Sequence, residues 1–202
     1  MTDSLAGRVV ALIGAGTDGD RAFVVACAEA GANIALGTID KRQAQEFAMN
    51  SIANEIWSIG REHFVRVMDH ADPTAVIAFA DEIWDRLGRC DLAVLTHDVP
   101  SFAPIEELSP DEWEATIQLN LTAPFLAAQA IGRLMEREGF GRLLLLIPTD
   151  DSGDAAYRAA RAGLRVAAEV MDAALRPRGV SVETGIALPM GIATLESMPP
   201  WR

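Results

Sequence analysis

The feature of this 202-residue chain that most constrains its fold is a regular alternation of short apolar runs with longer amphipathic segments. A nearly continuous apolar run of five or six residues is typical of a strand that is covered on both faces. Six segments have this character: 8–13, 33–37, 63–68, 91–95, 142–147 and 180–186. The alternation predicts an α/β fold with a doubly wound parallel sheet of about six strands and helices on both faces, in a single domain spanning 1–202.

Helix boundaries are readable between these runs. Asp72 followed by Pro73 is typical of an N-cap and first helical residue. Ser109, Pro110 and Glu112 form the pattern of a capping box with proline in the first turn. Glycine is expected just after a helix ends, and four glycines fall at such places: Gly31, Gly60, Gly88 and Gly179.

The composition narrows the classes of partner. Half of the residues are hydrophobic, and the net charge of −12 argues against nucleic acid or an anionic membrane as a partner. The N-terminal residues lack the pattern of a signal peptide, and no apolar stretch approaches the ~20 residues that a bilayer span needs. We expect a cytoplasmic protein with no metal site, in which Cys27 and Cys90 are buried free thiols.

The turn after the first apolar run, "IGAGTDGDRA", is where a phosphate-binding loop is expected in a doubly wound sheet. Gly14, Gly16 and Gly19 fit the general dinucleotide fingerprint, with an acidic residue, Asp40, further along the chain. Two aspartates occupy the same turn, at positions 18 and 20. A carboxylate there repels a pyrophosphate, but it is also a preferred partner for a helix N-terminus. We therefore expect Asp18 or Asp20 to cap the first helix in place of a phosphate.

Several stretches together resemble the short-chain dehydrogenase/reductase family over residues 5 to about 194. They are "GRVVALIGAG", "DRAFVVACAEAGANIAL", "VMDHAD", "SPDEWEATIQLNLTAPFLAAQAIGRLM", "GRLLLLI" and "YRAARAGLRVAAEVMDAALRPRGVSVETGIALPMGIAT". The resemblance implies a Rossmann-like fold, a bound NAD or NADP, and hydride transfer to or from an alcohol or carbonyl carbon. It also implies an active site of Asn, Ser, Tyr and Lys.

The resemblance assigns candidate catalytic residues one at a time. Tyr157 stands at the position of the general acid/base, and Asn120 at that of the active-site asparagine. Arg161 replaces the lysine that lowers the tyrosine pKa, and the two side chains share a helix face. The serine position falls at Ile147 and Pro148, so Thr149 is the nearest available hydroxyl.

The resemblance also assigns cofactor contacts. Asp69 matches the residue that contacts the adenine amino group, and Asp40 could accept from a ribose hydroxyl. Lys41 and Arg42 could instead meet a 2′-phosphate, so the preference between NAD and NADP stays open. In the family's own register the turn keeps Gly14, while Asp18 and Asp20 replace the other two glycines. "LTHD", residues 95–98, replaces Asn-Asn-Ala-Gly, and its His97 is expected to face solvent as a loop histidine.

These departures leave three functional hypotheses. The first is a divergent family member with degraded glycine-rich and catalytic motifs, in which cofactor binding and hydride transfer are impaired or lost. The second is an active oxidoreductase with a non-standard site of Tyr157, Arg161 and Asn120, perhaps with Thr149. The third is a non-catalytic structural or assembly subunit. The residues after about position 186 also predict that the usual C-terminal strand and substrate lid are lacking.

Two helical segments rich in small residues, 123–135 and 157–175, correspond to the family's dimer interface. The resemblance therefore implies a homodimer or tetramer. The alternative is that the small residues serve packing against the sheet.

Overall fold

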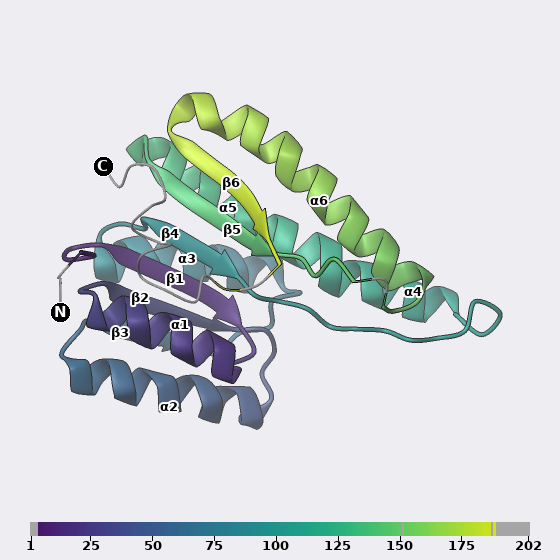
Figure 1. Ribbon diagram of the computed structural model, residues 1–202, viewed down its shortest axis with the longest axis horizontal. Helices are drawn as coiled ribbons and strands as arrows, with labels where there is room; N and C mark the ends of the chain where they lie inside the picture. Colours follow the sequence, from purple (N-terminus) through teal and green to yellow (C-terminus); the bar gives the residue numbers. More distant parts are fainter. Residues whose placement is uncertain (1–3, 151, 187, 189–202) are drawn as a thin grey trace.

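In the computed structural model, which describes residues 4–150, 152–186 and 188, a parallel six-stranded sheet has the order β3-β2-β1-β4-β5-β6 (Figure 1). The strands are β1 (Val9–Gly14), β2 (Asn33–Thr38), β3 (His63–Arg66), β4 (Leu92–Leu95), β5 (Gly141–Leu146) and β6 (Val180–Gly185). The order reverses direction at β1, which has β2 on one side and β4 on the other. A crevice at the carboxyl ends of the strands is expected at this switch point. The predicted Rossmann-like fold is confirmed.

Two layers of helices cover the sheet. The helices are α1 (Asp18–Glu29), α2 (Gln43–Ile59), α3 (Pro73–Leu87), α4 (Pro110–Ile117), α5 (Ala123–Glu138) and α6 (Ala155–Leu175), with a π-helical turn η1 (Gln118–Thr122) and a 3-10 turn η2 (Arg176–Arg178). Helices α1 and α2 pack on one face, and α3, α5 and α6 on the other (Figure 1).

Alternation along β1 divides the core between these faces. Val10 and Leu12 join the buried cluster that contains α1 and α2. Val9, Ala11 and Ile13 join the cluster that contains α3, α5 and α6. Because both faces are buried, the strand reads as a continuous apolar run, which is the pattern that predicted it.

The predicted helix boundaries are largely confirmed. Asp72 caps α3 through the Thr74 N–H, and Ser109 and Glu112 form the capping box of α4. Gly60 and Gly88 are the left-handed C-caps of α2 and α3. Two details differ: Ala30 is the C-cap of α1, one residue before Gly31, and Gly179 ends η2 rather than α6, because α6 already ends at Leu175.

Strand β3 is shorter than predicted and ends at Arg66. The reason is a side chain at the end of β2. The Thr38 hydroxyl accepts from the Met68 N–H and donates to the Met68 carbonyl, each at 2.8 Å. This exchange replaces the backbone ladder and turns the segment after β3 across the end of β2.

The two cysteines are buried and free, as predicted, and burial raises the pKa of Cys27 to about 12. Within the described ranges, no helix has the length and apolarity required to cross a bilayer. The same residues contain no group of three or more side chains suited to holding a metal ion. The predicted lack of a C-terminal strand and lid concerns residues 189–202, which lie outside the described residues.

Candidate functional site

The turn after β1 is held by a capping box at the start of α1. Thr17 is the N-cap, and its hydroxyl accepts from the Asp20 N–H at 3.1 Å. The Asp20 carboxylate accepts in return from the Thr17 N–H at 2.9 Å and is 1% exposed as a residue. Asp18 is exposed and lies in the first helical turn. The expectation that Asp18 or Asp20 caps α1 was wrong in its residue: the N-cap is Thr17, and Asp20 contributes as the N3 partner of the capping box.

The glycines of the turn fit close internal packing. A Cβ on Gly14 would lie 2.3 Å from Thr96 Oγ1 and 3.0 Å from Asp20 Oδ2, so no side chain fits there. Gly16 has a φ of +75°, and a Cβ on it would lie 2.8 Å from the Ala48 Cβ. Gly19 has more room, because the nearest side-chain atom, Leu188 Cδ1, would lie 3.7 Å from its Cβ. Gly14 and Gly16 are therefore required by the fold, whether or not a ligand binds.

Asp40 and Asp69 make local bonds at the ends of β2 and β3. Asp40 accepts from the Arg42 N–H at 2.8 Å and from Arg42 Nε at 2.5 Å. It also accepts from the Gln45 amide at 3.2 Å. Asp69 accepts from the Ala71 N–H at 2.9 Å, which is the bond of an aspartate turn. Both carboxylates lie on the carboxyl edge of the sheet, where the resemblance places cofactor contacts.

Tyr157 lies in the first turn of α6 and is 1% exposed as a residue. Its hydroxyl donates to Asp98 Oδ1 at 2.5 Å. Burial and then the hydrogen bond to the Asp98 carboxylate raise the pKa of Tyr157 well above its ordinary value of 10.0. The raised pKa is opposite to what a base at neutral pH needs.

Arg161 lies one helical turn after Tyr157 and is also buried. Its Nε donates to the Pro148 carbonyl at 2.9 Å, and its Nη2 donates to Asp150 Oδ1 at 2.8 Å. Its guanidinium carbon lies 4.8 Å from the centre of the Tyr157 ring. The positive charge lowers the pKa of Tyr157, but less than burial and Asp98 raise it.

Asn120 lies in the π-helical turn η1 and is buried. Its oxygen accepts from the Val99 N–H at 2.9 Å, and its amide nitrogen donates to the carbonyls of Val99 and Thr116 at 3.0 and 3.1 Å. The side chain therefore fastens the segment after β4 to η1. Thr149 is exposed and lies in the segment that follows β5.

Of the sequence-predicted catalytic residues, the structure brings together Tyr157 and Arg161. Asp98 completes this group and was not predicted, although one signal pointed to it: it stands at the glycine of the family's Asn-Asn-Ala-Gly segment. The expectation for His97 was wrong, since it is 5% exposed and packs against His70, with ring centres 5.0 Å apart. The sequence contained no signal for the contact with His70.

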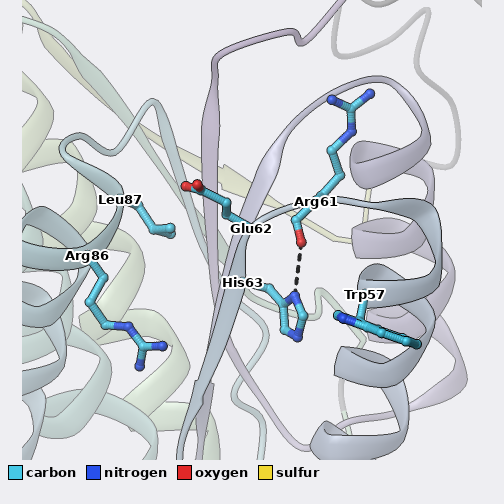
Figure 2. Close-up of a pocket in the computed structure, with 6 residues that line it drawn as sticks. All are labelled: Trp57, Arg61, Glu62, His63, Arg86 and Leu87. Carbon is cyan, nitrogen blue, oxygen red and sulfur yellow. Dashed lines mark hydrogen bonds between the residues drawn. The ribbon is translucent and has the colours of Figure 1, made fainter.

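A surface hollow of about 350 Å³ lies at the opposite end of the sheet. Figure 2 shows its lining side chains, which come from the end of α2, the start of β3 and the end of α3: Trp57, Arg61, Glu62, His63, Arg86 and Leu87. Because β3 begins there, the hollow is at the amino ends of the strands, away from Tyr157. It contributes nothing to the candidate site.

Comparison with known proteins bears on the family and the fold. A family model described as short chain dehydrogenase matches residues 8–195. D-threitol dehydrogenase of Mycolicibacterium smegmatis is 31% identical over 186 residues, which are 89% of this chain and 69% of that protein. The chain therefore spans about two thirds of that relative's length.

Two solved structures show the same fold with a cofactor. A metagenomic short-chain oxidoreductase in complex with NADP is 27% identical with a TM-score of 0.83, covering 96% of this chain and 90% of that one. An NAD⁺-bound xylitol dehydrogenase is 23% identical with a TM-score of 0.80, covering 89% of this chain and 69% of that one. At that identity the second likeness concerns the fold alone.

Proposed function

The chain belongs to the short-chain dehydrogenase family, and we propose that it is a member in which cofactor binding and hydride transfer are lost or strongly impaired, and which acts by assembling with copies of itself. One observation carries the proposal: the hydrogen bond of 2.5 Å from the Tyr157 hydroxyl to Asp98. The tyrosine that should exchange a proton with substrate is already bound to a carboxylate of its own chain.

The hydrogen bond opposes acid/base work in two ways. A general acid/base must reach the reacting oxygen, and its pKa must lie near the working pH. The Tyr157 hydroxyl donates its hydrogen bond to the Asp98 carboxylate instead of to a substrate oxygen, and the carboxylate raises the tyrosine pKa. Arg161, the cation in the lysine position, donates hydrogen bonds from two of its nitrogens to the Pro148 carbonyl and the Asp150 carboxylate.

The turn after β1 does not fit a dinucleotide either. A pyrophosphate rests on the free N–H groups of a helix start, and two N–H groups here, those of Thr17 and Asp20, are already bonded within the capping box. A phosphate brought to ~4 Å from this carboxylate meets a repulsion of roughly 4 kcal/mol at an effective dielectric near 20. That weakens binding about a thousandfold. Leu188 also lies against Gly19, where the helix start would meet the phosphates.

Calorimetric titration with NADH and NADPH tests the proposal. We expect dissociation constants weaker than about 1 mM, as follows from a thousandfold loss from micromolar affinity. We also expect no turnover with a panel of ketones, alcohols and polyols. Low-micromolar affinity for either cofactor would contradict the proposal.

The second candidate is an active oxidoreductase of alcohols or carbonyls built on Tyr157, Arg161 and Asn120, with Thr149 as a substitute hydroxyl. The observation that favours it is the Arg161 guanidinium, which lies 4.8 Å from the Tyr157 ring centre and lowers its pKa. The relative that acts on D-threitol suggests a polyol as first substrate to try, with NAD or NADP. Cofactor-dependent turnover that is lost in Tyr157→Phe would establish this reading instead.

Assembly is proposed from the helices α5 and α6. One face of each is buried in the core, while α6 presents Val166 and Val170 to solvent at 59% and 64% exposure. We propose that this face joins two copies in a homodimer, or four in a tetramer, in the cytoplasm. The charge of −12 does not favour nucleic acid or an anionic membrane as partner. Light scattering on the eluting protein checks the assembly, and a monomer at micromolar concentration would remove it.

A further inference from the structure

Two imidazoles meet over the carboxyl ends of β2 and β1. The segment after β3 crosses the end of β2, where the His70 N–H donates to the Ile39 carbonyl at 2.7 Å. The segment after β4 crosses the end of β1, where the Thr96 N–H donates to the Ile13 carbonyl at 3.0 Å. The rings of His70 and His97 then touch edge to face, with their centres 5.0 Å apart and their planes at 82°. The contact therefore joins two loops at the carboxyl edge of the sheet, beside the switch point where a ligand crevice is expected.

This contact is apolar although both side chains are polar. His70 is 1% and His97 is 5% exposed. None of their four ring nitrogens makes a well-formed hydrogen bond in the part of the chain that the structure describes; the Leu119 carbonyl acts on His97, but not in hydrogen-bonding geometry. A neutral imidazole has one donor and one acceptor, and leaving them unpaired in the interior destabilises the closed arrangement. Such groups call for a functional or structural explanation.

Few charges act on the pair. Asp98, on the same segment, and Asp40, from the end of β2, favour the protonated form of His97, as does the Leu119 carbonyl of η1. His70 faces His97, whose charge would oppose its own. Burial outweighs these effects, and it lowers the pKa of His70 to about 3 and that of His97 to about 4.

We propose that the contact between His70 and His97 is an acid-sensitive clasp, which opens when the imidazoles are protonated and separates the segments after β3 and β4. The clasp sets whether these two segments stay together at the carboxyl edge of the sheet, and it does not rest on the proposed function. Opening must also break the bond of 3.3 Å from the Gln118 amide to the Ala71 carbonyl, which ties the segment after β3 to η1.

The direction of the effect follows from proton linkage. The closed form binds no proton on either ring above about pH 4, whereas an open, solvated imidazole has a pKa near 6.5. The closed form is therefore most favoured above pH 6.5, and its population relative to the open form decreases as the pH falls below that value. At pH 5 each exposed imidazole shifts the balance toward opening by roughly 30-fold, and the two together by about 1000-fold.

Hydrogen exchange of the whole protein at pH 7.5 and pH 5.0, corrected for the intrinsic pH dependence, tests the clasp. We expect the amides of peptides covering 67–72 and 95–100 to exchange at least roughly tenfold faster at pH 5.0 than at pH 7.5, while the amides of β1 and β5 stay protected. In His70→Phe or His97→Phe one imidazole is removed, so the shift toward opening at pH 5.0 should shrink by roughly 30-fold. In the double variant, which has neither ring to protonate, the faster exchange should disappear. The matched control is His63→Phe. His63, the third histidine of the chain, lies at the start of β3, far from the clasp, so its replacement should leave the faster exchange at pH 5.0 unchanged.

Two outcomes would overturn the inference: equal protection of both segments at the two pH values, or a loss of protection spread over the whole sheet. Should a Phe variant not fold, the imidazole resonances of the wild-type protein decide. Titration of His70 and His97 near 6.5 with both segments still protected would also overturn it. These measurements use neither cofactor nor turnover, so the clasp can fail while the proposed function stands, and the reverse.

Discussion

The turn that begins α1 and the segment that follows β4 each carry an aspartate where the family has glycine, and the two carboxylates have different partners. Asp20 accepts from a backbone N–H at a helix start, where the helix dipole favours a negative charge. Asp98 accepts from the hydroxyl of Tyr157. The first arrangement belongs to a capping box at the start of α1, while the second raises the pKa of the Tyr157 hydroxyl.

The difference teaches that fold and chemistry are separable at this edge of the sheet. The Asp20 carboxylate accepts from one N–H group at the helix start that a bound anion could otherwise use. The Asp98 carboxylate satisfies a buried phenol, which would otherwise lack a partner. Each aspartate is locally favourable, and in the proposed function both oppose hydride transfer. The comparison predicts that changes at position 20 act on affinity and stability, and that changes at position 98 act on Tyr157.

The largest effect is expected on cofactor affinity. In Asp20→Gly the carboxylate is gone and the Thr17 N–H is free to face a phosphate. We expect NADH to bind up to about 1000-fold more tightly than to the wild-type protein, which corresponds to the repulsion of roughly 4 kcal/mol. Isothermal titration at low salt measures it. Asp18→Gly is the control, because its exposed carboxylate is screened by solvent and should change the affinity less than about tenfold.

An unchanged affinity in Asp20→Gly would contradict the claim that the Asp20 carboxylate weakens cofactor binding. It would mean that another feature of the crevice, such as Leu188 or the histidine pair, excludes the cofactor. An equal gain in both variants would show instead that net charge, rather than the position of Asp20, sets the affinity.

The second effect concerns the pKa of Tyr157, which is the single tyrosine of the chain, so that its ionisation is visible at 295 nm without ambiguity. In Asp98→Asn the negative charge beside the hydroxyl is lost, and we expect the pKa to fall by at least about one unit. Asp150→Asn is the control, since Asp150 has the weakest effect among the groups that act on the Tyr157 pKa. An equal fall of the Tyr157 pKa in both variants would show that Asp98 has no specific effect on Tyr157.

The third effect is on stability. Asp20→Ala removes one half of the capping box of α1, and we expect a loss of about 1 kcal/mol in the free energy of unfolding, measured with urea. Asp18→Ala lies on the exposed side of the same turn and should stay within about 0.5 kcal/mol of wild type. If the two losses were equal, Asp20 would contribute to folding no more than a surface charge does.

Much of the fold was predictable because its signals are local. The continuous apolar runs of β1, β4 and β5 report burial on both faces, and the sequence around Ser109 specifies its own cap. The strand that was mispredicted, β3, ends where a distant hydroxyl, that of Thr38, captures Met68. No pattern within the strand carries that information.

The candidate site was predictable in its members but less so in its contacts. Tyr157 and Arg161 are four residues apart on one helix, and their proximity follows from helix geometry. Asp98 lies 59 residues from Tyr157 in sequence, and His70 meets His97 across two neighbouring strands. Such contacts depend on the sheet order and on how each loop leaves its strand, which the linear pattern does not encode.

The smallest effect is expected from Arg161→Lys, which restores the family's own residue. A lysine has one ammonium, so it cannot keep both the Pro148 and Asp150 bonds in the planar geometry of the guanidinium. The hydroxyl of Tyr157 would still donate to Asp98, so no turnover with NADH or NADPH is expected, and the tyrosine pKa should change by less than about half a unit. Steady-state assays and the absorbance titration check both. Turnover in this single variant would show that the absence of the lysine, and not the hydrogen bond to Asp98, prevents proton transfer by Tyr157. The contrast between the two aspartates would then no longer explain the site.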